Sequence, residues 1–172
     1  MAFVITSREE FQVHRFNLVV AIGIPLLALF LQASLPTRFG FFALFDLPLL
    51  VTIFFAVSRR SQVMGVMTGS IIGIIQDSLT HQPLGAFGIA KTIVGYAASS
   101  IGIRVDVENP GSRLLLTFAF YFLHQAVYFT IMRSLVESPI ATTWTTELGS
   151  AFANALLAVV LFALLDKTKQ RS

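Results

Sequence analysis

The sequence predicts an all-α polytopic membrane protein that crosses a bilayer about six times. Hydrophobic residues make up 55% of the chain and charged residues only 12%, whereas soluble domains carry roughly 25% charged residues. The mean hydropathy is +0.78, and apolar runs recur along the whole chain. A water-soluble globule could not cover its surface with so few charges, so lipid is the expected surroundings for most of these side chains.

The expected helices are six apolar segments separated by short polar interruptions. A spanning helix needs ~20 mostly apolar residues. We place the spans at about residues 16–35, 39–57, 63–80, 84–103, 114–132 and 148–165. Only the short run from Thr80 to Pro83 separates the third from the fourth. Pro25 and Pro48 lie inside the first and second spans and are expected to kink them. The whole chain is then a single integral membrane domain, residues 1–172.

The distribution of basic residues predicts that both termini are cytoplasmic. Lysine and arginine favour cytoplasmic loops. With the N-terminus inside, the outer segments hold only Arg38 and Arg133. The inner segments hold Arg8, Arg15, Arg59, Arg60, Arg104, Arg113, Lys167, Lys169 and Arg171. The first apolar run is too long for the core of a cleavable signal peptide, so we expect it to be retained as a span.

Ionisable side chains inside the expected spans are candidates for a site, because they are costly in lipid. Asp46 and Lys91 both lie ~10 Å below the outer boundary and Asp77 ~5 Å below it, at 1.5 Å rise per residue. We therefore expect Lys91 to pair with Asp46 or Asp77. Two interpretations are open: an ion pair that fixes helix register, or a polar pocket for a lipid headgroup or small ligand. His124 is expected near mid-membrane, hydrogen-bonded across helices or part of a proton relay.

Glycines recur at four-residue spacing in the third span, at Gly65, Gly69 and Gly73. Positions four apart share one helix face, and small residues there let two helix backbones approach closely. Gly95 lies on a comparable face of the fourth span, which also carries Gly88, Ser99 and Gly102. This pattern fits packing of the third span against the fourth, or docking of a partner's single helix.

Catalytic patterns are missing from the sequence. There is no cysteine, which excludes disulfides and thiol chemistry. No paired carboxylates with a histidine at the same depth, and no phosphate-binding glycine loop, can be recognised. We therefore expect neither enzymatic activity nor a cofactor or metal.

The segment from Asp46 to Tyr96 resembles one known family. It holds a glycine-rich helix with Asp77 near its end, a Pro83-Leu84-Gly85 turn, and a helix with Thr92, Gly95 and Tyr96. These features, with the chain length and the number of spans, are similar to the rod shape-determining MreD family. The resemblance implies a fold similar to the six-helix substrate-binding S components of energy-coupling-factor transporters.

The resemblance also implies a function. It is that of a non-enzymatic scaffold in the bacterial inner membrane, part of the cell-elongation machinery for peptidoglycan synthesis. The implied partners are MreC, a single-span membrane protein, and through it MreB and RodA–PBP2, together with membrane lipid and no nucleic acid. The alternative is a vitamin-binding S component. In that case Asp46, Asp77, Lys91 and Trp144 would line an outer pocket.

Overall fold

The protein is helical throughout the part of the chain that its structure, a computed structural model, describes. Residues 17–103, 109–136 and 143–168 are described. These residues form six α-helices and one 3-10 helix and contain no strand, which confirms the all-α prediction. The elements are α1 (Leu18–Arg38), η1 (Gly40–Leu44), α2 (Leu47–Arg59), α3 (Gln62–Leu79), α4 (Ala86–Gly102), α5 (Pro110–Ser134) and α6 (Trp144–Asp166). Both termini, with Arg8, Arg15, Arg104, Lys169 and Arg171, lie outside the described residues.

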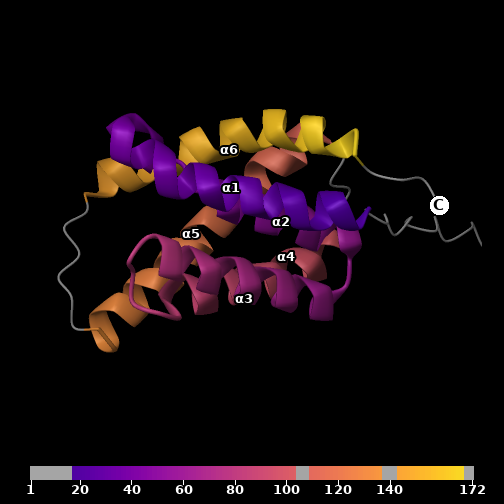
Figure 1. The fold of residues 1–172 in the computed structure, drawn as a ribbon. Coiled ribbons are helices and arrows are strands. Elements are labelled where there is room, and N and C mark those ends of the chain that lie inside the picture. Colours follow the sequence, from indigo (N-terminus) through magenta and orange to yellow (C-terminus); the bar gives the residue numbers. More distant parts are fainter. Residues whose placement is uncertain (1–16, 104–108, 137–142, 169–172) are drawn as a thin grey trace, which may run out of the picture.

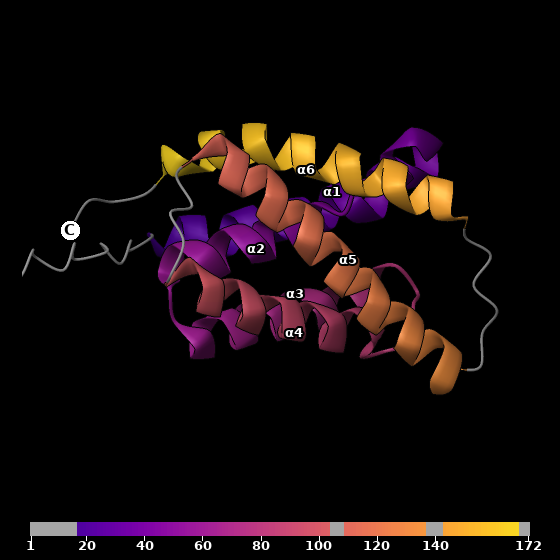
Figure 2. The ribbon, with the colours of Figure 1, turned by 180° about the vertical axis from the view of Figure 1, so that it is seen from behind.

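The helices form an elongated bundle in which α1 and α6 lie on one side and the α3–α4 hairpin on the other (Figure 1). Seen from behind, α5 crosses the bundle obliquely (Figure 2). We call the end that holds Arg59, Arg60 and Arg113 the arginine end. The opposite end, with η1, the turn at residues 80–85 and the start of α6, is the turn end.

Helix α2 is the centre of the bundle. It packs against each of the other five helices, and every residue from Pro48 to Ser58 is buried. Leu49 and Leu50 are fully enclosed, and the Phe54 ring meets Phe162 of α6 at 5.4 Å between centroids. Burial on all sides explains why this helix reads as a continuous apolar run rather than an amphipathic stripe.

Large apolar side chains cover the outside of the bundle. On α6 an outward row at four-residue spacing consists of Leu148, Phe152, Leu156, Val160 and Leu164. Their exposed fractions run from 44% to 60%. A similar row on α1 consists of Leu18, Ile22, Leu26 and Phe30. Continuous apolar rows of this length suit acyl chains rather than water.

Four segments are long and apolar enough to cross a membrane: α1, η1 with α2 (Gly40–Arg59), α5 and α6. The remaining two helices, α3 and α4, have 18 and 17 residues. At 1.5 Å rise per residue they are about 27 and 25 Å long, close to the ~30 Å hydrocarbon core. Both run alongside the other helices (Figure 1).

The second expected span, residues 39–57, corresponds to the apolar segment Gly40–Arg59, but it is not one continuous helix. The chain forms the short η1, breaks at Phe45 and Asp46, and only then begins α2. Pro48 does not kink a helix here, because it lies in the first turn of α2, where its missing N–H has no intrahelical partner to lose. In contrast, α1 continues through both Pro25 and Pro36 to Arg38.

Candidate functional site

The break between η1 and α2 places Asp46 inside the bundle as the N-cap of α2. Its Oδ1 accepts a hydrogen bond from the backbone N–H of Leu49 at 2.9 Å. A side-chain oxygen in this position satisfies one of the free N–H groups of the first turn. The other carboxylate oxygen is left to face the interior, so the cap and the ion pair described below use different atoms of the same side chain.

Two amide side chains from opposite elements hold this break. Gln32 of α1 donates to the carbonyl of Phe45 at 2.9 Å and accepts from the N–H of Leu47 at 3.0 Å. Asn154 of α6 accepts from the N–H of Asp46 at 2.9 Å and donates to the carbonyl of Leu44 at 2.8 Å. Backbone groups freed by a broken helix in a membrane must find partners. These two amides, the amide clamp, supply them.

Lys91 of α4 is fully buried and reaches the cap from the other side. Its Nζ lies 2.7 Å from Asp46 Oδ2 and 3.2 Å from His124 Nε2. The same nitrogen lies 4.7 Å from the centre of the Phe87 ring, within cation–π distance. The structure thus brings Lys91 to Asp46 rather than to Asp77. Two hydrogen-bond partners and one aromatic ring of this chain therefore surround the ammonium.

The polar network continues from His124 toward the start of α6. When Lys91 donates to Nε2 of a neutral His124, the ring proton must be on Nδ1. This Nδ1 lies 3.2 Å from Gln125 Oε1. The Gln125 amide donates to Glu147 Oε2 at 2.7 Å, and the Tyr121 hydroxyl donates to the same oxygen at 3.1 Å. Hydrogen bonds therefore connect α2, α4, α5 and α6 through the middle of the bundle.

Asp77 has a different role from the one expected. It is fully buried at the end of α3, yet it lies against the first turn of α4. Its two oxygens accept hydrogen bonds from the backbone N–H groups of Gly85, Phe87 and Gly88 at 2.8, 3.0 and 3.1 Å. The N-terminus of a helix stabilises a carboxylate in this way. No cation lies within ion-pair distance of Asp77 among the residues that the structure describes.

The hairpin turn before α4 depends on Gly85. This residue has φ +98°, in the left-handed region that glycine adopts at no steric cost. Pro83 precedes it, and its carbonyl accepts from the N–H of Ala86 at 3.1 Å. The turn thereby presents three N–H groups to Asp77. The hydrogen bonds of Asp77 in turn hold the turn in this conformation.

The glycines of α3 meet the backbone of α4. A Cβ placed at Gly65, Gly69 or Gly73 would lie 2.4, 2.1 or 2.4 Å from a backbone oxygen of α4. Gly95 faces Gly65 from the other helix. Gly102 does not belong to this interface, although the spacing grouped it with the others. It packs against Val57 of α2 at the arginine end.

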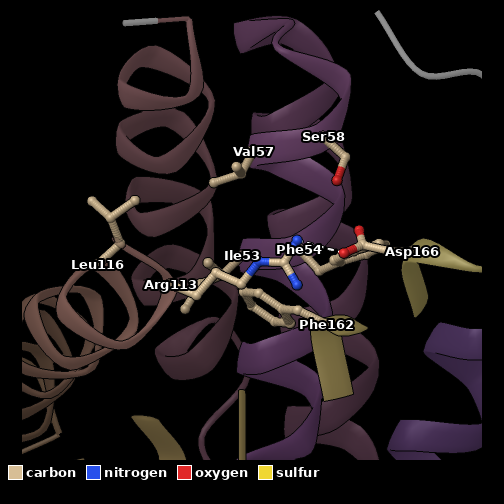
Figure 3. A pocket seen from close by; sticks show the side chains of 8 residues that line it. All are labelled: Ile53, Phe54, Val57, Ser58, Arg113, Leu116, Phe162 and Asp166. Carbon is tan, nitrogen blue, oxygen red and sulfur yellow. Dashed lines mark hydrogen bonds and ion pairs between the residues drawn. The ribbon is translucent and has the colours of Figure 1, made fainter. Parts of the chain in front are cut away.

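A second ion pair closes the arginine end, where α5 begins and α6 ends. Figure 3 shows the Arg113 guanidinium pointing toward the carboxylate of Asp166, beside the apolar side chains of Ile53, Phe54 and Phe162. The space beside the pair is about 10 Å³, at the lower limit for one water molecule. This pair ties two helices together and leaves no room for a ligand.

Four residues of the network were not identified from the sequence: Gln32, Tyr121, Glu147 and Asn154. Each is a lone polar residue within or beside an apolar run. That pattern was the feature of the sequence that could have indicated a buried hydrogen-bonding role. Trp144 was proposed as a pocket residue, but it is 82% exposed. No group of three potential metal ligands occurs among residues 17–103, 109–136 and 143–168. Chemically, the site consists of the Asp46–Lys91 ion pair and two carboxylates, Asp77 and Glu147, that accept hydrogen bonds from groups of the chain.

Comparison with known proteins gives one family. The family model described as rod shape-determining protein MreD matches residues 14–168, nearly all of the 172-residue chain. No curated protein and no solved structure matches the chain. The match covers the glycine-rich α3, the Asp77 cap, the Gly85 turn and the Lys91 network together. This chain therefore belongs to the MreD family of membrane proteins, which act in rod-shape determination.

Proposed function

We propose that the chain is a non-enzymatic scaffold of the cell-elongation machinery in the bacterial inner membrane. The observation that carries this proposal is the family match over residues 14–168. On this proposal the chain binds MreC and, through MreC, links MreB to the RodA–PBP2 synthase of peptidoglycan. No nucleic acid is involved.

The topology of the proposal is six crossings, with the arginine end in the cytoplasm. Among the described residues, Arg59, Arg60, Arg113 and Lys167 lie at that end, whereas Arg38 and Arg133 lie at the turn end. An excess of basic residues on one side supports a cytoplasmic location for that side. The lengths of α3 and α4 support the proposal that these two helices also cross the membrane, in addition to the four more apolar segments.

The closed polar network supports a structural role for the ionisable groups rather than catalysis. Lys91 and Asp77 are fully buried, and His124 is 1% exposed. Each has hydrogen-bond partners within the chain. A catalytic acid, base or nucleophile must reach a substrate, whereas Lys91 and His124 face each other and Asp77 faces the first turn of α4. A scaffold needs only that they hold the helices in place.

The alternative of a vitamin-binding S component has less support. Such a protein needs a roomy pocket with polar groups that converge on the ligand. Lys91 and Asp77 have no exposed surface, and Trp144 points away from the bundle at 82% exposure. The residues proposed to line the pocket therefore do not surround a common space.

The test is purification of the tagged full-length chain from its host's membranes, followed by mass spectrometry of proteins and small molecules. We expect MreC in a stoichiometric amount and no vitamin. A control variant is Gly23→Ala, whose added Cβ meets nothing within 4 Å and which should retain MreC. A bound vitamin, or an ATPase module in place of MreC, would contradict the proposal.

A further inference from the structure

Glu147 is a carboxylate in the interior of the bundle with no cation beside it. It lies in the first turn of α6 and is 8% exposed. Among the residues that the structure describes, no basic nitrogen comes within ion-pair distance of it. The Tyr121 hydroxyl and the Gln125 amide, both neutral, donate to its Oε2. Ionised groups inside membrane proteins usually pair with an opposite charge, so a carboxylate in this place calls for a balancing charge at a greater distance.

The hydrogen-bond chain from Lys91 to Glu147 can run in only one direction. An ammonium group can only donate, and an ionised carboxylate can only accept. Lys91 Nζ lies 3.2 Å from His124 Nε2, so this ring nitrogen is the acceptor. At the other end, Gln125 Nε2 donates to Glu147 at 2.7 Å, which turns its Oε1 toward His124 Nδ1 at 3.2 Å. Both ends therefore require the same state, a neutral His124 with its proton on Nδ1.

Neighbouring aromatic rings hold the His124 ring in the plane that this chain needs. The rings of Phe87 and Tyr128 lie nearly parallel to it, at 12° and 6° between planes and 5.7 and 6.4 Å between centroids. The imidazole is 1% exposed. In such a low-dielectric interior, successive hydrogen bonds polarise one another, so a charge at one end of a chain strengthens the bonds at the other end. The chain is thus directed from a positive end on α4 to a negative end on α6.

From these observations we propose that Glu147 is a remote counter-ion of Lys91. His124 and Gln125 relay its charge as a directed chain of hydrogen bonds, while Asp46 remains the counter-ion in direct contact. The first turn of α6 is in this way coupled to the ion pair at the break before α2, so a change at Glu147 acts on Lys91 although the two share no hydrogen bond or ion pair. The inference goes beyond the scaffold function and does not rest on the identity of any protein partner.

The coupling is measured by a double-mutant cycle between positions 91 and 147, from reversible unfolding of the full-length chain in mixed micelles. The variants are Lys91→Met, Glu147→Gln and the two together. We expect Glu147→Gln to lower the folding equilibrium constant about tenfold in wild type, but about threefold or less in Lys91→Met. The reason is that the charge of Glu147 has no cation to balance once Lys91 is gone. Equal effects in both backgrounds would overturn the proposal.

Two controls separate the relay from attraction through space and from general destabilisation. Gln125→Leu cuts the chain, so Lys91→Met and Glu147→Gln should act independently in that background. Coupling that survives Gln125→Leu would show attraction through space and would overturn the relay. Tyr128→Phe removes a hydrogen bond from the same helix to Gln82, outside the chain, and keeps the ring. Its effect should be the same with and without Lys91.

The direction of the chain is tested without changing either end of it, which keeps the proposal falsifiable when the Glu147 variants do not fold. His14→Gln with His81→Asn leaves His124 as the single histidine. Asparagine suits position 81, where φ is 55°, because it tolerates the left-handed region. NMR of the nitrogen-labelled ring at neutral pH should show a proton on Nδ1 and none on Nε2. A proton on Nε2, or on both nitrogens, would overturn the proposal, because Lys91 could then not donate to the ring.

Discussion

The α3–α4 hairpin and the α1–α6 pair show two ways in which this chain holds neighbouring helices. In the hairpin, glycines remove side chains from the interface, and a Cβ at Gly69 would lie 2.1 Å from the Lys91 carbonyl oxygen. Helices α1 and α6 have no such interface. Among the described residues they do not pack on each other directly, but both pack on α2 and both contact the break at Phe45 and Asp46, which Gln32 and Asn154 hold from either side.

The difference lies in the source of the stabilisation. Membrane helices gain little from the hydrophobic effect when they associate, so close packing and hydrogen bonds must supply the energy. The hairpin uses close backbone packing, which depends on shape and tolerates no added volume. The α1–α6 region uses a few hydrogen bonds to the break, so it depends on particular polar atoms.

The largest effect is expected from Gly69→Ala. The new Cβ would meet the α4 backbone at 2.1 Å, and a backbone cannot move aside as a side chain can. The loss should exceed the ~1–3 kcal/mol of ordinary overpacking, leaving little folded protein. The measurement is the yield of monodisperse protein in detergent, with helix content by circular dichroism.

Gly23→Ala is the control for this substitution, because nothing lies within 4 Å of its added Cβ. We expect a yield equal to wild type or higher, since alanine is favoured over glycine inside a helix by ~0.5–1 kcal/mol. Equal yields for the two variants would show that the hairpin is not held by close backbone packing.

Lys91→Met is expected to have the next largest effect. It leaves the Asp46 carboxylate charged and buried without its cation, at a cost of ~3–5 kcal/mol. The double variant Lys91→Met with Asp46→Asn removes both charges while keeping an oxygen to cap Leu49, so it should recover most of that loss. Reversible unfolding by sodium dodecyl sulfate in mixed micelles measures both.

The double variant also tests what the ion pair is for. A chain that folds and still supports rod shape in its host would show that the pair serves stability alone. A double variant as unstable as Lys91→Met would contradict the assignment of Asp46 as the main partner of Lys91.

The smallest effect is expected in the amide clamp. Asn154→Leu or Gln32→Leu each leaves backbone groups of the break unpartnered, at ~1–3 kcal/mol. Because both amides hold the same break, their effects should not add, and a double-mutant cycle by the same unfolding measurement gives the coupling. Strict additivity would show that α1 and α6 stabilise the protein independently of each other.

Local features of the sequence account for the hairpin. The four-residue spacing of Gly65, Gly69 and Gly73 defines one face of a helix from sequence alone. Pro83 and Gly85 mark the turn, and Asp77 lies one turn before it. The Asp77 cap acts over eleven residues or fewer, from Asp77 to Gly88, and the glycine face is defined within one helix, so local geometry restricts the arrangements that the chain can take.

The sequence by itself determined the helical class, the membrane setting and the positions of most helices, because these follow from composition and short-range periodicity. Only the tertiary structure decided that Lys91 meets Asp46 while Asp77 caps α4, that Gly102 faces α2, and that the second apolar segment breaks. These outcomes depend on contacts between distant residues, such as Asn154 with the backbone of Asp46, 108 residues away. No local pattern encodes such a pairing, since it exists only after the helices have packed.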